Sequence, residues 1–309
     1  MKMDKIKEID TNSWHLFLDE SGDANYKRLR RFKRQNNWIE FRPDPSNVTF
    51  FSLAGLLVSG KDLVESFIPA MKKVKQELYG NEDTVTHLSD MLAGKGNFTM
   101  YKNKPELLKK HLNAIINAII NVDFVFNIVH IDKVKMLNKY EENASNPYEL
   151  APTIIMERSA GYIWQSKKNT DKVIRVWFES RTKGKDKELK RFMIRELGIV
   201  FPKKGKVIQR NHFPRYKKSS NNINNIKWHI HSLPKYPSKL KQIRYYVDKY
   251  SYEIGKDLIN GIHLSDIIVS ASRKSIENTI YNKYKHFEVE PILEFINHSG
   301  KLIYQKFLP

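Results

Sequence analysis

The chain has 309 residues, no cysteine and a formal net charge of +20 at pH 7. The lack of cysteine excludes disulfides, thiolate zinc sites and a cysteine nucleophile. So large a basic excess favours a polyanionic partner, with nucleic acid ahead of an anionic membrane surface, although a genome rich in Lys and Asn codons produces a basic chain too. No apolar run approaches the ~20 residues that span a bilayer, and the charged first residues do not resemble a signal peptide, so we expect a cytoplasmic protein without membrane contact.

An apolar stretch near the start of the chain ends in two adjacent carboxylates. The pattern predicts a short buried β-strand at 15–18 that delivers Asp19 to the end of a sheet. Strand alternation puts Phe17, Asp19 and Ser21 on one face and Glu20 on the other. A carboxylate beside a core needs a compensating partner, and a divalent cation is a strong one. Asp19 is therefore the first candidate for a metal ligand and Glu20 the second.

Two other interpretations of this stretch remain open. The sequence DESGD at 19–23 is also ordinary turn chemistry, in which Asp and Ser side chains bond nearby N–H groups and Gly supplies a positive φ. A phosphatase-type loop, in which an apolar strand ends in Asp-x-Asp, is the other alternative, but Ser21 occupies its second acidic position.

The remaining elements follow from hydrophobic periodicity and from the positions of Gly and Pro. We expect a single domain over 1–309 with a C-terminal extension at 279–309 that adds a short helix and an edge strand. A short extended piece at 85–90 carries His87. The other predicted strands lie at 48–58, 123–131 and 173–178, and the helices lie at 61–79, 104–121, 147–165, 186–197 and 255–278.

Two basic, aromatic segments stand out from the rest of the chain: a basic loop at 26–47, and an insertion at 201–250 that precedes the last helix and has one acid, Asp248. Cations neutralise phosphates and rings stack on bases, so both segments suit a nucleic-acid groove, and a solvated loop is the plain alternative. The candidate nucleic-acid-binding residues are Arg30, Arg31, Lys33, Arg34, Lys95, Arg181, Lys183, Lys185, Arg215, Lys217 and Lys218.

Three carboxylates are predicted to come from separate rigid elements. Asp19 ends the first strand, Glu179 ends the strand at 173–178, and Asp266 lies amid apolar residues of the last long helix. Oxygen ligands of this kind suit Mg²⁺ or Mn²⁺, and a pair of such ions ~3.5–4 Å apart hydrolyses phosphodiesters. We therefore expect a site for two divalent ions.

The motifs resemble those of the domain-of-unknown-function family numbered 3800, and the resemblance covers about residues 14–275. It implies an α/β fold of the RNase H-like kind, a mixed β-sheet flanked by α-helices, in bacterial proteins associated with mobile elements or phage defence, where a protein partner is expected. The residues that carry it are Asp19-Glu20-Ser21-Gly22, Thr86-His87-Leu88, GKGNF at 94–98, Glu179 and Gly261-Ile262-His263-Leu264-Ser265-Asp266.

The resemblance also implies roles for single residues. Asp19 matches the first-strand aspartate of RNase H-like nucleases, with Glu20 beside it, and Glu179 and Asp266 match later acids. The family's Gly-x-Gln-x-Ala-Asp motif has His263 for Gln and Ser265 for Ala here. His87 matches a family histidine that contacts substrate or orients water, and Asp186 is a further candidate unless it caps a helix.

The sequence thus predicts a metal-dependent nuclease whose catalytic residues are Asp19, Glu20, His87, Glu179 and Asp266. A nucleic-acid-binding module that has lost catalysis is the alternative, and a small-molecule phosphatase with the same acids is a third reading. Only a nuclease would cleave oligonucleotides in a metal-dependent way.

Overall fold

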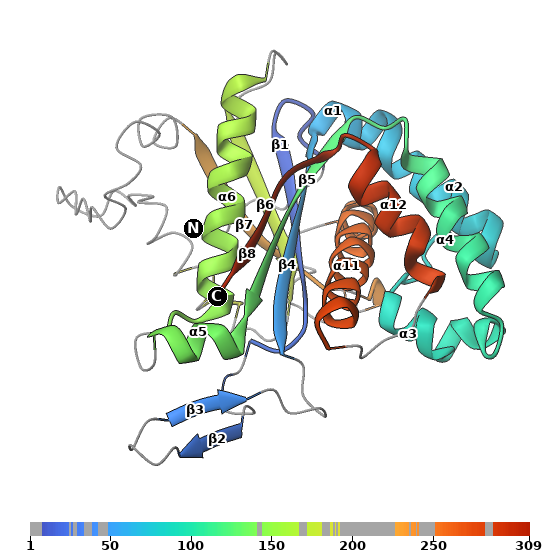
Figure 1. Cartoon of the computed structure of the whole chain (residues 1–309). Helices are drawn as coiled ribbons and strands as arrows, with labels where there is room; N and C mark the ends of the chain where they lie inside the picture. The colour runs from blue at the N-terminus through green and yellow to red at the C-terminus, as the bar shows by residue number, and fades with distance from the viewer. Residues whose placement is uncertain are drawn as a thin grey trace, which may run out of the picture.

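The computed structural model describes residues 8–24, 26, 30–33, 39–42, 49–140, 144–166, 172–180, 186–187, 189, 191, 226–234, 236–238, 240, 251–281 and 287–309. Its centre is a mixed six-stranded sheet with the order β7-β6-β1-β4-β5-β8 (Figure 1). Helices cover both faces of this sheet. The α/β class and the mixed sheet flanked by helices agree with the prediction.

The sheet is antiparallel on one side of β1 and parallel on the other. β1 (Trp14–Ser21) pairs antiparallel with β4 (Phe50–Ser59), which pairs antiparallel with β5 (Phe124–Asp132). On the other side, β1 pairs parallel with β6 (Val173–Glu179), which pairs parallel with β7 (Lys227–Leu233). The last strand, β8 (Leu302–Leu308), lies parallel to β5 at the far edge.

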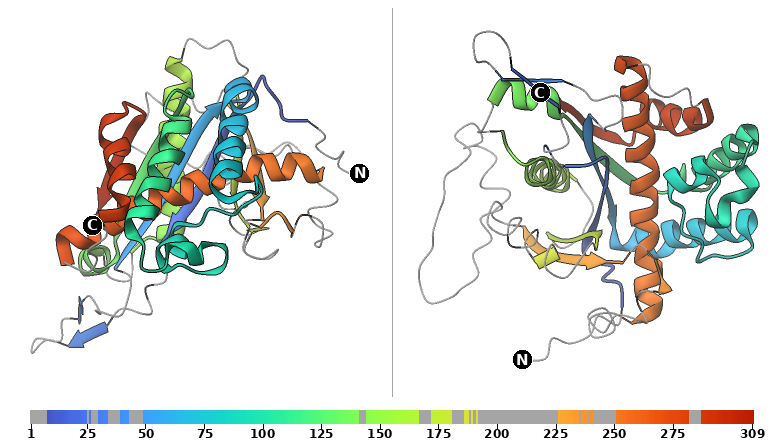
Figure 2. Two further views of the ribbon diagram at one scale, coloured as in Figure 1. Left: turned by 90° about the vertical axis from the view of Figure 1, so that its right-hand side faces the viewer. Right: turned by 90° about the horizontal axis from the view of Figure 1, so that it is seen from below.

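Among the described residues, five longer helices pack on the two faces of the sheet. The 19-residue helix α6 (Pro147–Gln165) covers one face, and the 30-residue helix α11 (Tyr252–Tyr281) crosses the other (Figures 1 and 2). Outside α11 lie α2 (Ile68–Tyr79), α4 (Pro105–Ile119) and α12 (Glu290–His298). The shorter elements are α1 (Gly60–Asp62), a π-helical turn (Leu63–Phe67), α3 (Leu88–Ala93), a 3₁₀ turn (Gly96–Tyr101), α5 (Lys133–Tyr140) and a 3₁₀ turn (Phe287–Val289).

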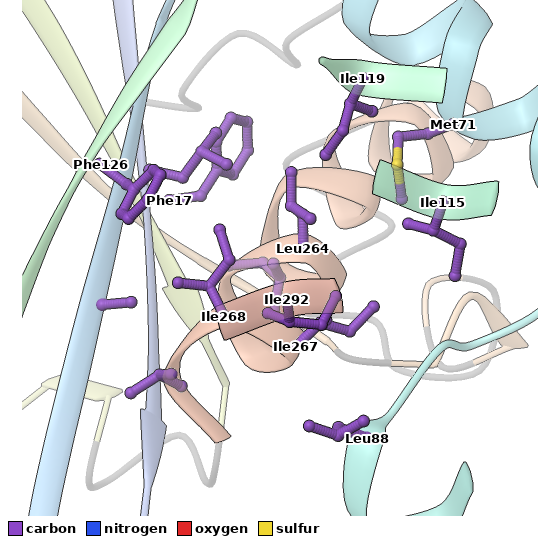
Figure 3. Close-up of a cluster of buried hydrophobic side chains, with 14 of the residues drawn as sticks. Phe17, Met71, Leu88, Ile115, Ile119, Phe126, Leu264, Ile267, Ile268 and Ile292 are labelled. Carbon is purple, nitrogen blue, oxygen red and sulfur yellow. The ribbon is translucent and has the colours of Figure 1, made fainter. Parts of the chain in front are cut away.

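Strand alternation divides the core into two apolar layers. Phe17 of β1 and Phe126 of β5 point toward α11, where Leu264 and Ile268 meet them (Figure 3). The neighbouring residue Leu18 points the other way, into the layer beneath α6. The predicted separation of the two faces of the first strand is therefore confirmed.

Helix α11 lies unusually close to β1. A Cβ added at Gly261 would come within 2.4 Å of the Phe17 ring, so a side chain cannot fit there without movement. One turn later, the Ser265 hydroxyl donates to the Phe17 carbonyl at 3.1 Å. Small residues on this side of α11 let the helix approach the sheet.

Most of the long elements lie where periodicity predicts them. The helix predicted at 147–165 has those bounds, and the helix at 61–79 forms with a π-helical turn ahead of Pro69, near the start of α2. Gly80 ends α2 with a φ of 68°. The predicted tail also forms: α12 packs in the core and β8 is an edge strand.

One predicted element needs correction, and the two basic segments contain strands. The segment at 85–90 is not extended throughout, because α3 begins at Leu88 and His87 is its N-cap residue. The loop at 26–47 contains a hairpin of β2 (Arg30–Lys33) and β3 (Ile39–Arg42), which projects from the sheet (Figure 1). The insertion at 201–250 contributes β7, a strand of the central sheet, whereas its residues 201–225 and 241–250 lie outside the described residues. Within the part of the chain that the structure describes, no helix is long and apolar enough to cross a membrane.

Candidate functional site

Asp19 and Glu179 occupy equivalent positions on two neighbouring parallel strands. The pairing of β1 with β6 joins Phe17 to Trp177 and Leu18 to Phe178, so Asp19 and Glu179 come next on their strands. Phe17 and Trp177 both belong to the apolar layer under α11, and alternation puts the two carboxylates on that same face. Asp19 is 1% exposed and Glu179 is half-buried. Two acids that were predicted separately are therefore neighbours near the carboxyl ends of two interior strands.

Glu20 lies on the opposite face of β1. The Tyr148 hydroxyl of α6 donates to Glu20 Oε2 at 3.2 Å, whereas Asp19 Oδ1 accepts from the Glu20 backbone N–H at 2.9 Å. Sequence reasoning listed Glu20 with the catalytic acids, but this contact separates its side chain from that of Asp19. The contact with Tyr148, 128 residues away, had no signal in the sequence.

The pKa of the Tyr148 phenol reports how the acids are distributed. Burial raises this pKa first, and the negative charges of Asp19, Glu179 and Asp186 raise it further. All three carboxylates thus act on one hydroxyl near the end of β1 and β6. The Ser180 hydroxyl donates to Asp186 Oδ2 at 2.5 Å, which ties Asp186 to the end of β6.

Asp266 projects from α11 toward α3 and is 2% exposed. Its Oδ2 accepts a hydrogen bond from the Leu88 N–H at 2.8 Å, and its Oδ1 lies 3.5 Å from His87 Nε2. On the other side of the ring, His87 Nδ1 lies 2.9 Å from Asp90 Oδ2. Asp266 and His87, predicted from distant parts of the chain, are therefore neighbours, and Asp90 joins them.

The contacts of α11 with β1 set Asp266 near the strand that carries Asp19. Ser265 contacts the Phe17 carbonyl, and the Ser270 hydroxyl donates to Ser21 Oγ at 3.1 Å. The turn of α11 between these contacts passes along β1 beside Asp19. Asp266 lies four residues before Ser270 and so shares its side of the helix.

Asp132 shows what a purely structural strand-end acid looks like in this fold. It ends β5 and is 3% exposed, but its Oδ1 accepts hydrogen bonds from the N–H groups of Val134 and Lys135 at 3.0 and 3.1 Å. Asp132 is the N-terminal cap of α5. Asp19 lies inside β1, and its Oδ1 accepts from the N–H of the next strand residue, Glu20.

Two carboxylates suit a hard divalent ion that keeps most of its water ligands, and they are too few to enclose an ion completely. Within the described ranges, no three His, Asp or Glu side chains gather closely enough to hold a metal ion. Mg²⁺ typically takes one or two protein carboxylates and completes its shell with water and substrate phosphate. Asp19 and Glu179 supply such a pair, whereas Asp266 faces His87 and α3.

The candidate nucleic-acid-binding residues are only partly covered. Lys95 is exposed between α3 and the 3₁₀ turn, and the backbone of Arg30, Arg31 and Lys33 forms β2 of the projecting hairpin. The others lie outside the described residues, namely Arg34, Arg181, Lys183, Lys185, Arg215, Lys217 and Lys218.

Sequence reasoning missed Asp90 and Tyr148. Asp90 follows His87 by three residues, a spacing that brings two side chains together only once a helix begins there. The helix signal was present in Gly94, which ends α3 with a φ of 57°.

Comparisons of the chain with protein-family models, with curated proteins and with solved structures give no match.

Proposed function

We propose that the protein is a metal-dependent nuclease that hydrolyses phosphodiester bonds in RNA or DNA. The observation that carries the proposal is the parallel pairing of β1 with β6, which sets Asp19 and Glu179 side by side on the face that α11 covers. Two carboxylates in this arrangement repel each other unless a cation lies between them. Asp132, in the same sheet, caps a helix with its Oδ1, whereas Asp19 Oδ1 accepts from the Glu20 N–H.

In this mechanism Asp19 and Glu179 would hold the metal, and Asp266 would complete the site from α11. A bound Mg²⁺ or Mn²⁺ would lower the pKa of an attacking water and would stabilise the charge that develops on the leaving oxygen. The residues themselves act mainly by position: rigid strands keep the two carboxylates in register, and the close contact of Gly261 with Phe17 keeps α11 against them. The half-buried His87 can reach a substrate phosphate from the α3 side.

The RNase H-like fold is part of the same proposal. A mixed sheet with helices on both faces is what the resemblance implies, and the first strand of the chain is central in the sheet. The formal charge of +20 supports a polyanionic substrate. A role in phage defence or a mobile element, with a protein partner, remains an expectation from the resemblance.

A nucleic-acid-binding module without catalysis is the second candidate. One observation favours it, namely that the described residues contain no group of three metal-ligand side chains. Both candidates predict binding to nucleic acid, and only the nuclease predicts metal-dependent cutting.

A cleavage assay separates the two. Labelled single-stranded RNA, duplex DNA and an RNA–DNA hybrid are incubated with the protein and Mg²⁺, Mn²⁺ or EDTA. The nuclease proposal predicts cutting that EDTA stops. Asp266→Asn should lower the rate of cutting on the order of 100-fold, because changing even a residue that only hydrogen-bonds to a metal ligand typically lowers activity 10- to 100-fold. Binding of every substrate without cutting in any metal would favour the module instead.

A further inference from the structure

The hairpin of β2 and β3 is basic and projects from the central sheet (Figure 1). Its two strands, RRFK and IEFR, carry four cations and a single acid, Glu40. The register pairs Arg30 with Arg42, so two positively charged residues are opposite each other. Like charges in opposite positions destabilise a two-stranded ribbon, which is only marginally stable by itself. This pairing costs stability in the free protein, and a bound polyanion would relieve it.

Helix α5 continues the basic surface beside the hairpin. Strand β3 lies next to α5, and Tyr26, which precedes β2 in the chain, packs on the buried side of the helix. The helix contains three lysines and no acid. On its exposed side are Lys135, 3.7 Å from Asp132 Oδ2, together with Lys139 and the exposed ring of Tyr140. We call the hairpin of β2 and β3 together with α5 the basic arm.

The basic arm starts at the end of the sheet where the candidate acids lie. Ser21, at the end of β1, pairs with Ser52 of β4, which pairs in turn with His130 near the end of β5. The hairpin follows β1 along the chain, and α5 follows β5 directly. Only β4 separates β1 from β5, which places these two strands about 10 Å apart. The basic arm and Asp19 are therefore at the same end of the sheet.

We propose that the basic arm binds the phosphate backbone of duplex DNA and presents the duplex to the carboxylate pair of β1 and β6. The major groove of B-DNA, about 12 Å wide, admits a two-stranded β-ribbon, whereas the deep and narrow major groove of duplex RNA does not. Both strands of the ribbon carry cations, with Arg31 and Lys33 on β2 and Arg42 on β3, so each strand can meet one wall of the groove. Presentation to the carboxylates rests on the proposed nuclease function, and DNA binding by the arm does not.

Binding to a labelled DNA duplex in EDTA tests the basic arm without any cutting. Fluorescence anisotropy at several salt concentrations gives the slope of log affinity against log salt, to which each phosphate contact contributes about 1. We expect Arg30→Gln/Arg42→Gln and Lys135→Gln/Lys139→Gln each to make this slope shallower by about 2. Arg30→Lys/Arg42→Lys should keep the wild-type slope, because the charge is retained.

A charge-matched control comes from the other end of the sheet. Lys61→Gln/Lys73→Gln removes two cations whose side chains are 70% and 79% exposed. Lys61 lies in α1, which follows the end of β4 opposite the basic arm. This variant should keep the wild-type slope. If it loses as much slope as the arm variants do, or if the arm variants keep theirs, the inference is wrong.

Three probes of equal length test the choice of duplex DNA. At about 150 mM salt, Arg30→Gln/Arg42→Gln should lower affinity for duplex DNA on the order of 10-fold or more. The losses with duplex RNA and with single-stranded DNA should be smaller, because neither offers a groove that admits the ribbon. Equal losses with all three probes would overturn the assignment to duplex DNA.

The outcome also separates this inference from the nuclease proposal. If the arm variants bind duplex DNA weakly and wild type cuts no substrate in any metal, the basic arm stands and the nuclease proposal fails. If wild type cuts duplex DNA with Mn²⁺ and the arm variants bind as tightly as wild type, the nuclease stands and the inference about the arm is wrong.

Discussion

Asp19 and Asp132 are both buried in strands of the central sheet, but Asp132 caps a helix and Asp19 does not. The Oδ1 atom of Asp132 accepts from two N–H groups at the start of α5, whereas Asp19 Oδ1 accepts from the N–H of the next residue in the same strand. Glu179 lies beside Asp19 on the neighbouring strand.

Lys75 is a second residue whose burial has a measurable consequence. It is 1% exposed, its Nζ donates to Asn260 Oδ1 at 2.7 Å, and it lies 2.8 Å from His263 Nδ1. Burial lowers the pKa of this lysine to about 7. In the unfolded chain the same amine keeps its proton up to about pH 10.4.

We therefore expect the free energy of unfolding to rise between about pH 7 and about pH 10, because the unfolded chain carries a proton that the folded one lacks. Lys75→Met should remove this rise, and Lys73→Met, at an exposed position of the same helix, should keep it. Urea unfolding at both ends of the range measures the difference. Parallel pH profiles for wild type and Lys75→Met would contradict the lowered pKa.

At the scale of elements, the contact of α11 with β1 organises the site. The helix carries Gly261 against the Phe17 ring, Ser265 against the Phe17 carbonyl and Asp266 toward α3. A shift of this helix would separate Asp266 from both β1 and His87. The packing of Gly261 against Phe17 therefore affects the position of Asp266 relative to His87 and to Asp19.

Gly261→Ala tests this contact. The new Cβ would lie 2.4 Å from the Phe17 ring, so we expect a destabilisation of about 1–3 kcal/mol, the usual cost of overpacking. Gly161→Ala in α6 is the matched control, because no atom lies within 4 Å of its added Cβ. That variant should be neutral or more stable by about 0.5–1 kcal/mol. Chemical denaturation measures both, and equal effects would show that α11 does not pack as described.

The long elements could be predicted from the sequence because their patterns are local. The helix at 147–165 and the strand that ends at Glu179 follow from residues within their own ranges. The helix after His87 was missed, because six residues give too short a pattern and the contact that stabilises its first turn comes from Asp266, 178 residues away.

The candidate site also divides into features that follow from local sequence and features that depend on distant contacts. Alternation predicted that Asp19 and Glu20 lie on opposite faces, and the structure bears this out through Phe17 and Leu18. The pairing of Asp19 with Glu179 could not be derived, because register between strands more than 150 residues apart depends on the whole fold. The contact of His87 with Asp90 depended in turn on a helix that was not predicted.

For the whole molecule, the net charge of +20 predicts how binding responds to salt. A protein that neutralises several phosphates releases counterions, so affinity falls steeply as salt increases. We expect binding to a single-stranded oligonucleotide, measured in EDTA to prevent cutting, to weaken on the order of 100-fold or more between about 50 mM and about 200 mM salt. Affinity that does not change over this range would contradict a nucleic-acid partner.

The buried histidines predict sensitivity of the whole fold to acid. Burial lowers the pKa of His15 to about 4 and of His130 to about 3, whereas both titrate near 6.5 in an unfolded chain. The unfolded state therefore binds more protons as pH falls below about 6.5, and stability should drop from there down to about pH 3. His130→Gln should show a shallower loss than wild type between about pH 6.5 and about pH 4, by urea unfolding, with exposed His298→Gln as the control. Identical slopes would be evidence against a neutral buried His130.

The central claim is that Asp19 and Glu179 form a metal-dependent phosphodiesterase site, and single-turnover cleavage by Asp19→Asn and Asp132→Asn tests it most directly. Both variants replace a buried aspartate of the central sheet by its near-isosteric amide, and Asn caps a helix about as well as Asp does. We predict that Asp19→Asn lowers Mg²⁺- or Mn²⁺-dependent cleavage on the order of 100-fold or more while Asp132→Asn cuts at the wild-type rate. Cleavage that is unaffected by Asp19→Asn, or lost equally in both variants, would contradict the account.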